Sequence, residues 1–296
     1  MIRRAVVALD ASQASAGLVE TAAAVLAGRP WAKALLLHVR EESSSEAVAQ
    51  ALVVRAARSL AARGLDVYPE VRIAGAAHRG EAIAAAIEEF GGDLLIIGSR
   101  GRDDLAGAVL GSVSHDALHR VDVPVLLVRG APGAARVAAV CAGGAALAAV
   151  ASASEAPAIA KALADLAPRA EACVVHVLEQ VRPLRPPELD GDLDDVVSAA
   201  LKSFKAVGVE ADGEAVMSVQ TVSETIEQVA AEQGADLLVV GSRRLSDMGG
   251  LVLGSVTHRL LHASDRPLLV AGRRARVRAF DPLQAPVLLG LSPSRS

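Results

Sequence analysis

The sequence predicts an α/β protein built from two tandem open parallel sheets, each of five strands with helices on both faces. Two observations carry this prediction. Residues 91–129 match residues 234–272 at a constant offset of 143, with 20 of 39 positions identical and no gap. Within each copy, continuous apolar runs alternate with helical patterns, as in a parallel sheet covered on both faces. The chain of 296 residues is therefore a duplication.

The expected strands are short apolar runs rich in Ala, Val, Leu and Ile, and the stretches between them have helical composition and spacing. In the first copy we expect strands at 2–9, 33–40, 65–74, 93–98 and 124–129, with helices at 13–27, 44–63, 80–90 and 112–120. In the second copy we expect strands at 171–178, 214–219, 236–241 and 267–271. Its first strand fits either 136–142 or 145–150. The boundary falls in the 130–134 stretch, which gives domains at 1–130 and 135–273 and a flexible tail at 274–296.

Composition excludes several classes of protein. The net charge is −4 and aromatic residues make up 2% of the chain, so neither a basic stripe nor stacking residues favour nucleic acid as a partner. The uncharged run at 137–154 is rich in Ala, Gly and Ser, which predicts no membrane span. Cys141 and Cys173 form no CxxC pair. They fit a reducing cytoplasm as small core residues, and the N-terminus lacks the pattern of a signal peptide.

Two strand ends carry residues suited to a nucleotide. Asp10 follows the first strand, and Gly98 and Gly101 follow the fourth, with Gly111 and Ser112 opening a helix nine residues later. Ligands of open parallel sheets bind beyond the carboxyl ends of the strands. Glycines let the backbone approach phosphate, and helix-start N–H groups stabilise its charge. Taken singly, each glycine could be an ordinary strand-end residue, and Asp10 could cap the next helix.

This arrangement resembles the universal stress protein family. The glycine motif, the Val-Pro-Val run from Val123, the Ala8-Leu9-Asp10 strand end and the His38-Val39 pair carry the resemblance, which covers both copies. It implies an adenine nucleotide alpha-hydrolase-like fold with strand order 3-2-1-4-5 in each half. In the ATP-binding branch, the Asp contacts ribose, the Val meets adenine and the glycine segment holds phosphates.

Carried over to this chain, the resemblance implies a nucleotide site in the first half. Its residues are Ala8, Leu9, Asp10, Val39, Gly98, Gly101, Gly111, Ser112, Val113 and Ser114. We add Arg100 as a phosphate contact because of its charge. We expect ATP, ADP or AMP, with or without Mg²⁺.

The second copy departs from the motif at both ends. Arg244 stands where the first copy has Gly101, and the residue after the first strand is Ala142 or Ala151 instead of Asp. We therefore expect a structural or regulatory half, and one nucleotide per chain.

Other features predict no catalytic or metal site. His115 and His119 lie four apart on a helix, as do His258 and His262, but no third ligand is apparent in the sequence. We expect exposed or capping histidines, and we expect the histidine ending the second strand of each copy to be structural. No Walker, GxSxG or GxGxxG motif occurs.

The function expected from the sequence is a cytoplasmic adenine-nucleotide-binding protein that acts in stress response or signalling. Alternatives are a nucleotide-free interaction scaffold and a slow nucleotide hydrolase on the same fold. The apolar end strands at 123–129 and 266–271 are edges that invite pairing, so we expect the halves to pair there as a pseudo-dimer within one chain. A dimer of whole chains is also allowed.

Overall fold

The computed structural model describes residues 1–12, 14–74, 79–98, 111–179, 192–218, 220–242 and 254–272. The elements of the first half are β1 (Arg4–Leu9), α1 (Ala14–Leu26), β2 (Lys33–Arg40), α2 (Glu46–Ala61), β3 (Asp66–Ile73), α3 (Arg79–Phe90), β4 (Leu94–Gly98), α4 (Ser112–Arg120) and β5 (Val125–Val128). Those of the second half are β6 (Ala145–Ala149), α6 (Ala156–Leu166), β7 (Glu171–Glu179), α7 (Asp192–Ala206), β8 (Ala211–Ser218), α8 (Val222–Glu232), β9 (Leu237–Gly241), α9 (Ser255–Ala263) and β10 (Leu268–Ala271). Helix α5 (Gly130–Cys141) joins the two.

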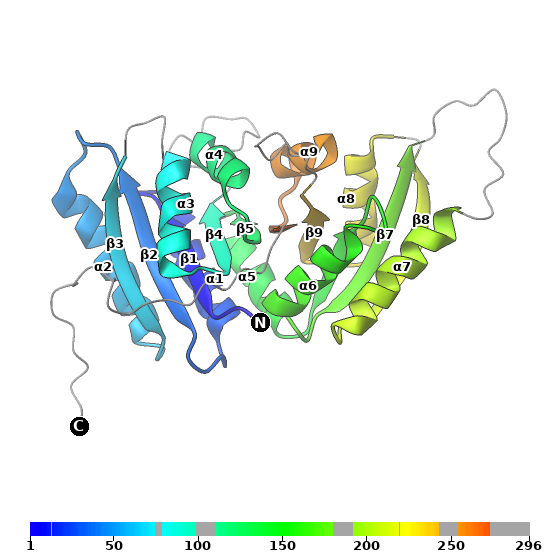
Figure 1. Ribbon diagram of the computed structural model, residues 1–296, viewed down its shortest axis with the longest axis horizontal. Helices are drawn as coiled ribbons and strands as arrows, with labels where there is room; N and C mark the ends of the chain where they lie inside the picture. The colour runs from blue at the N-terminus through cyan, green and yellow to red at the C-terminus, as the bar shows by residue number, and fades with distance from the viewer. Residues whose placement is uncertain are drawn as a thin grey trace.

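The strand order is the one that the sequence predicts. The strands run β3-β2-β1-β4-β5 in the first half and β8-β7-β6-β9-β10 in the second, parallel within each half. Figure 1 shows the sheet crossing the molecule from β3 to β8. Helices α1, α2, α5, α6 and α7 bury their apolar faces on one side of the sheet, and α3, α4, α8 and α9 on the other.

The predicted pairing of the end strands is present. β5 and β10 are antiparallel neighbours, with Leu126 opposite Leu269, and they join the halves into one ten-stranded sheet. Arg129 strengthens this seam: its guanidinium bonds Asp265 at 3.0 Å and donates to the carbonyl of Leu261, near the end of α9, at 3.0 Å. Since β5 and β10 pair within the chain, a dimer of whole chains would need another surface.

The first strand of the second half is β6, and the alternative at 136–142 is wrong. Those residues belong to α5 except for the last, Ala142, which is the helix C-cap. The helix packs against α1 of the first half, where Gly17 lies so close that a Cβ on it would come within 2.5 Å of the carbonyl carbon and oxygen of Gly130. The boundary expected at 130–134 therefore lies in the first turns of a packed helix.

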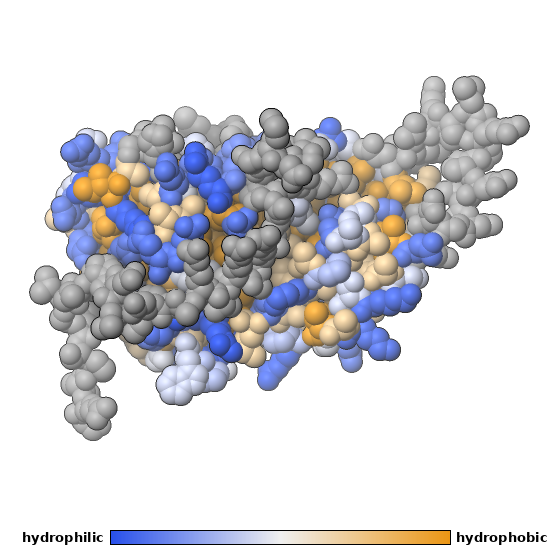
Figure 2. All heavy atoms as spheres, viewed as in Figure 1, coloured by the Kyte–Doolittle hydropathy of each residue, from blue (hydrophilic) through white to orange (hydrophobic). Residues whose placement is uncertain are grey.

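The uncharged run at 137–154 is divided between α5, β6 and the loop after β6. Among the described residues, no helix is both long and apolar enough to cross a bilayer. Hydrophilic and hydrophobic residues are interspersed over the face seen in Figure 2.

Both cysteines are free thiols in partly buried positions. Burial raises the pKa of Cys141 to about 11. It raises that of Cys173 to about 12, with the nearby carboxylates of Asp212 and Glu214 adding to the effect. Both thiols are therefore protonated at neutral pH and are poor nucleophiles.

Candidate functional site

Strands β1 and β4 are neighbours and end at the same edge of the sheet. Ala8 lies opposite Ile97 in their register, so Asp10 and Gly98 follow at adjacent strand ends. This is the place where strand order reverses, because β2 continues on one side and β5 on the other. An open parallel sheet binds its ligand at such a point.

Asp10 organises the turn between β1 and α1. Its Oδ1 accepts from the N–H of Ser12 at 3.0 Å and lies 2.5 Å and 3.0 Å from the hydroxyl oxygens of Ser12 and Ser15. The Asp10 N–H in turn bonds the Ser15 Oγ at 3.0 Å. These bonds form an Asx turn before α1, and none of them joins the Asp10 carboxylate to a backbone N–H of the helix. In the described part of the chain these side-chain bonds all use Oδ1, so the carboxylate is held in place with Oδ2 available to a ligand.

A small apolar surface lies beside this carboxylate. Ala8, Val39 and Val113 are all partly buried and pack on the α3–α4 side of the sheet. His38 holds the end of β2 through its Nδ1, which lies 2.7 Å from the carbonyl oxygen of Leu9. The Leu9 side chain is buried on the opposite face, in the core that includes α1, so Leu9 supports the strand and does not line this surface.

Helix α4 begins next to the end of β4. Gly111 is its N-cap and makes no side-chain capping bond, so the first N–H groups of the helix lack the usual capping acceptor. The Ser114 hydroxyl donates to the carbonyl oxygen of Gly98 at 2.6 Å, which fastens the start of the helix to the strand. Ser112 is exposed at the first helical position. The hydroxyl proton of Ser114 is thus used within the protein, whereas Ser112 faces outward.

Arg100 and Gly101 lie outside the described residues, as does Arg244. The structure places the other expected residues at adjacent elements: Ala8 and Asp10 at the end of β1, Val39 near the end of β2, Gly98 at the end of β4, and Gly111, Ser112, Val113 and Ser114 at the start of α4.

The second half has the same arrangement of strand ends, but different side chains lie beside them. The Nδ1 of His176 lies 2.7 Å from the carbonyl oxygen of Val150, as His38 does from that of Leu9, so Ala151 corresponds to Asp10. Glu155, the N-cap of α6, accepts a hydrogen bond from the N–H of Ala151. A Cβ on Gly241, the counterpart of Gly98, would collide with the other carboxylate oxygen of Glu155. A carboxylate of the chain thus lies between the ends of β6 and β9 in the second half.

Sequence reasoning missed Glu155. It lies four residues after Ala151, where the first copy has Ala14, so no motif marks it. Its role depends on a loop that folds back between the ends of β6 and β9. Ser12 and Ser15 were also missed, although a serine two residues after an Asp is a known signal of an Asx turn.

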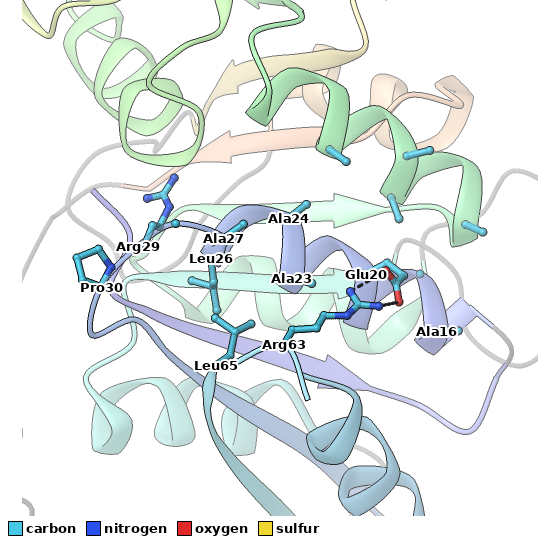
Figure 3. A pocket seen from close by; sticks show the side chains of 17 residues that line it. Ala16, Glu20, Ala23, Ala24, Leu26, Ala27, Arg29, Pro30, Arg63 and Leu65 are labelled. Carbon is cyan, nitrogen blue, oxygen red and sulfur yellow. Dashed lines mark hydrogen bonds and ion pairs between the residues drawn. The ribbon is translucent and has the colours of Figure 1, made fainter. Parts of the chain in front are cut away.

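A separate pocket of about 930 Å³ lies away from these strand ends, among α1, α5 and the turn before β3. Figure 3 shows its lining: small alanine side chains and the ion pair of Glu20 with Arg63. Its charged side chains are already engaged, Glu20 with Arg63 and Arg29 with the carbonyl oxygens of Asp165 and Leu166, so it offers few fixed contacts to a ligand.

The model of the family described as universal stress protein matches residues 1–129 and 145–272. The chain belongs to the universal stress protein family. Both halves are universal stress protein segments, which agrees with the repeat and with the shared strand order.

Solved structures show the same tandem architecture at low sequence identity. A universal stress protein from Archaeoglobus fulgidus DSM 4304 is 19% identical with a TM-score of 0.70, covering 92% of this chain and 98% of its own. A functionally unknown protein from Pseudomonas aeruginosa PAO1 is 20% identical with a TM-score of 0.64, covering 92% and 93%. No curated protein matches the chain. At this identity the likeness establishes the fold of this universal stress protein.

Proposed function

We propose that this universal stress protein binds ATP or a related adenine nucleotide in its first half and acts as a nucleotide-dependent sensor in the cytoplasm. The observation that carries the proposal is the convergence of three chemically different groups at the adjacent ends of β1 and β4. These groups are a fixed carboxylate, a partly buried apolar surface and an uncapped helix start.

Each group suits one part of a nucleotide. The surface of Ala8, Val39 and Val113 suits the flat adenine ring, and Asp10 suits a ribose hydroxyl as hydrogen-bond acceptor. The N-terminus of α4 suits phosphate, because helix N–H groups and the helix dipole favour an anion there. Gly101 and Arg100 extend the proposed phosphate contacts, and Mg²⁺ would accompany the phosphates as it does on nucleotides in general.

The position of Glu155 in the second half supports a stoichiometry of one nucleotide per chain. Glu155 places a negative charge against Gly241 and takes up the N–H of Ala151. A phosphate there would meet this carboxylate at short range, where like charges repel. The first half has the small residue Ala14 at the corresponding position.

Calorimetric titration of the full chain with ATP should give one site, and Asp10→Ala should weaken binding at least tenfold, about 1.4 kcal/mol. Asp10→Asn separates the charge from the hydrogen bonds of the turn, because an amide oxygen can still accept from the N–H of Ser12. Asp66→Ala is the control: it removes an equal charge from the start of β3, at the opposite end of the strands. Two equivalent sites, or unchanged binding by Asp10→Ala, would refute the proposal.

Gly101→Arg should also weaken ATP binding at least tenfold, because a long side chain would obstruct a backbone that must approach phosphate. The second copy carries Arg244 at this position, so we expect the melting temperature to stay near that of the wild type. Affinity at two salt concentrations distinguishes obstruction from charge effects. Equal or tighter binding would show that Gly101 does not line the phosphate site.

A further inference from the structure

Two histidine pairs that are 143 positions apart in the sequence meet at the seam between the halves. Figure 1 shows α4 and α9 next to each other above β5 and β9. The His115 ring from α4 lies edge-to-face with the His258 ring from α9, with centroids 6.4 Å apart and an interplanar angle of 87°. The antiparallel pairing of β5 with β10 produces this meeting, because it sets the same helix of each copy on either side of the seam.

Within each pair the ring nitrogens converge. The Nε2 atoms of His115 and His119 are 3.2 Å apart, and so are those of His258 and His262. Two nitrogens bound to one tetrahedral zinc ion at about 2.0–2.1 Å lie about 3.3 Å from each other. The spacing is therefore that of two ligands of one metal ion, and in the metal-free protein an Nε2–H···Nε2 hydrogen bond accounts for it.

In each pair, the pKa of one histidine is lowered, which favours the neutral imidazole that binds metal. Burial and then His115 lower the pKa of His119, with Arg120 acting in the same direction and Asp116 against it. Burial and then the imidazoles of His262 and His115 lower the pKa of His258.

The site is open to solvent and small. His115 and His258 are exposed, so an ion can reach both pairs from outside. Among the described residues, no group of three or more His, Cys, Asp or Glu side chains is arranged to hold one ion. An ion here would therefore have two protein ligands from one helix, with water completing its coordination.

We propose that α4 and α9 each chelate one divalent transition-metal ion through their two histidines, which makes the seam a two-ion site. Imidazole ligands select zinc, nickel or copper over magnesium and calcium. The proposal is independent of the nucleotide, because it uses none of the residues assigned to the nucleotide site. Bound metal would stabilise the folded chain, since the pairs form only when the helices do.

Calorimetric titration of the full chain with Zn²⁺ at neutral pH tests this, and we expect two ions per chain. Removing one pair with His115→Ala and His119→Ala should leave one ion, and replacing all four histidines should remove both. His115→Ala alone should weaken its own site at least tenfold. The control variants Arg120→Ala and Arg259→Ala change exposed side chains of the same helices and should keep both ions.

Co²⁺ gives a second readout, because its visible absorption reports nitrogen ligation and should vanish in the four-histidine variant. Zn²⁺ binding should weaken as the pH is lowered, because protons compete with the ion for the imidazole nitrogens. Binding that persists in the four-histidine variant would overturn the proposal, as would wild-type protein that binds no Zn²⁺. A single ion lost on removal of either pair would overturn the assignment of one ion to each pair.

Discussion

Leu269→Asp is expected to lower the free energy of unfolding by at least about 4 kcal/mol, which is a large part of the stability of an ordinary domain. Leu269 is 0% exposed and sits in β10, between Leu126 of β5 and Val239 of β9. The substitution removes a core side chain, which alone costs about 2–5 kcal/mol, and leaves an unpaired carboxylate in an apolar layer. Urea denaturation followed by circular dichroism measures the loss.

The matched control for this variant is Leu269→Ile, which keeps the volume and apolar character and should cost less than about 1.5 kcal/mol. The expected loss depends on β10 being buried by both of its neighbours. A Leu269→Asp protein with the wild-type denaturation midpoint would therefore show that the seam between β5 and β10 is open in solution.

Gly17→Ala is expected to destabilise the protein by about 2–3 kcal/mol, the range of an overpacked core. This expected loss of stability is opposite to the usual effect, because replacing glycine by alanine inside an exposed helix stabilises a protein by about 0.5–1 kcal/mol. Here the new Cβ would lie 2.5 Å from the carbonyl group of Gly130, which is backbone of α5 and cannot rotate away. Helices α1 and α5 would have to separate. Thermal unfolding by calorimetry measures the change.

Ala16→Gly is the companion variant, because Ala16 is the exposed neighbour of Gly17 in the same helix. It should cost only the helix-propensity difference, about 0.5–1 kcal/mol. If Gly17→Ala stabilised the protein by a similar amount, the close packing of α1 on α5 would not exist in solution.

Much of the fold could be predicted because its signals are local. Most strands of the first half are apolar runs bounded by charged or turn-forming residues, and all five of them start and end within two residues of the expected positions. Prediction was ambiguous at 136–150, where Ala, Val and Gly fit both a helix and a strand. Residues 136–141 continue α5 and residues 145–149 form β6. Helix α5 is placed by a contact of its Gly130 with Gly17, in a helix more than a hundred residues earlier.

Some residues of the candidate site could likewise be predicted from the sequence, and others could not. Asp10, Gly98 and Gly111 could be found because strand ends and glycine spacing are visible along the chain, and the register of β1 with β4 places the first two at adjacent strand ends. Glu155 could not be found, since its carboxylate reaches Gly241 only after α6 has docked beside β9.

By itself the sequence determined the duplication, the alternation of strands and helices, and the copy that keeps the full nucleotide motif. These follow from periodicity and identity, which need no knowledge of contacts. Tertiary structure alone decided that α5 is a helix, that Glu155 lies between the ends of β6 and β9 and that four histidines of α4 and α9 share one seam. Each of these depends on which distant segments pair across the sheet. The antiparallel joining of β5 to β10 brings residues 143 positions apart within reach of one another, and nothing in their local sequence records that distance.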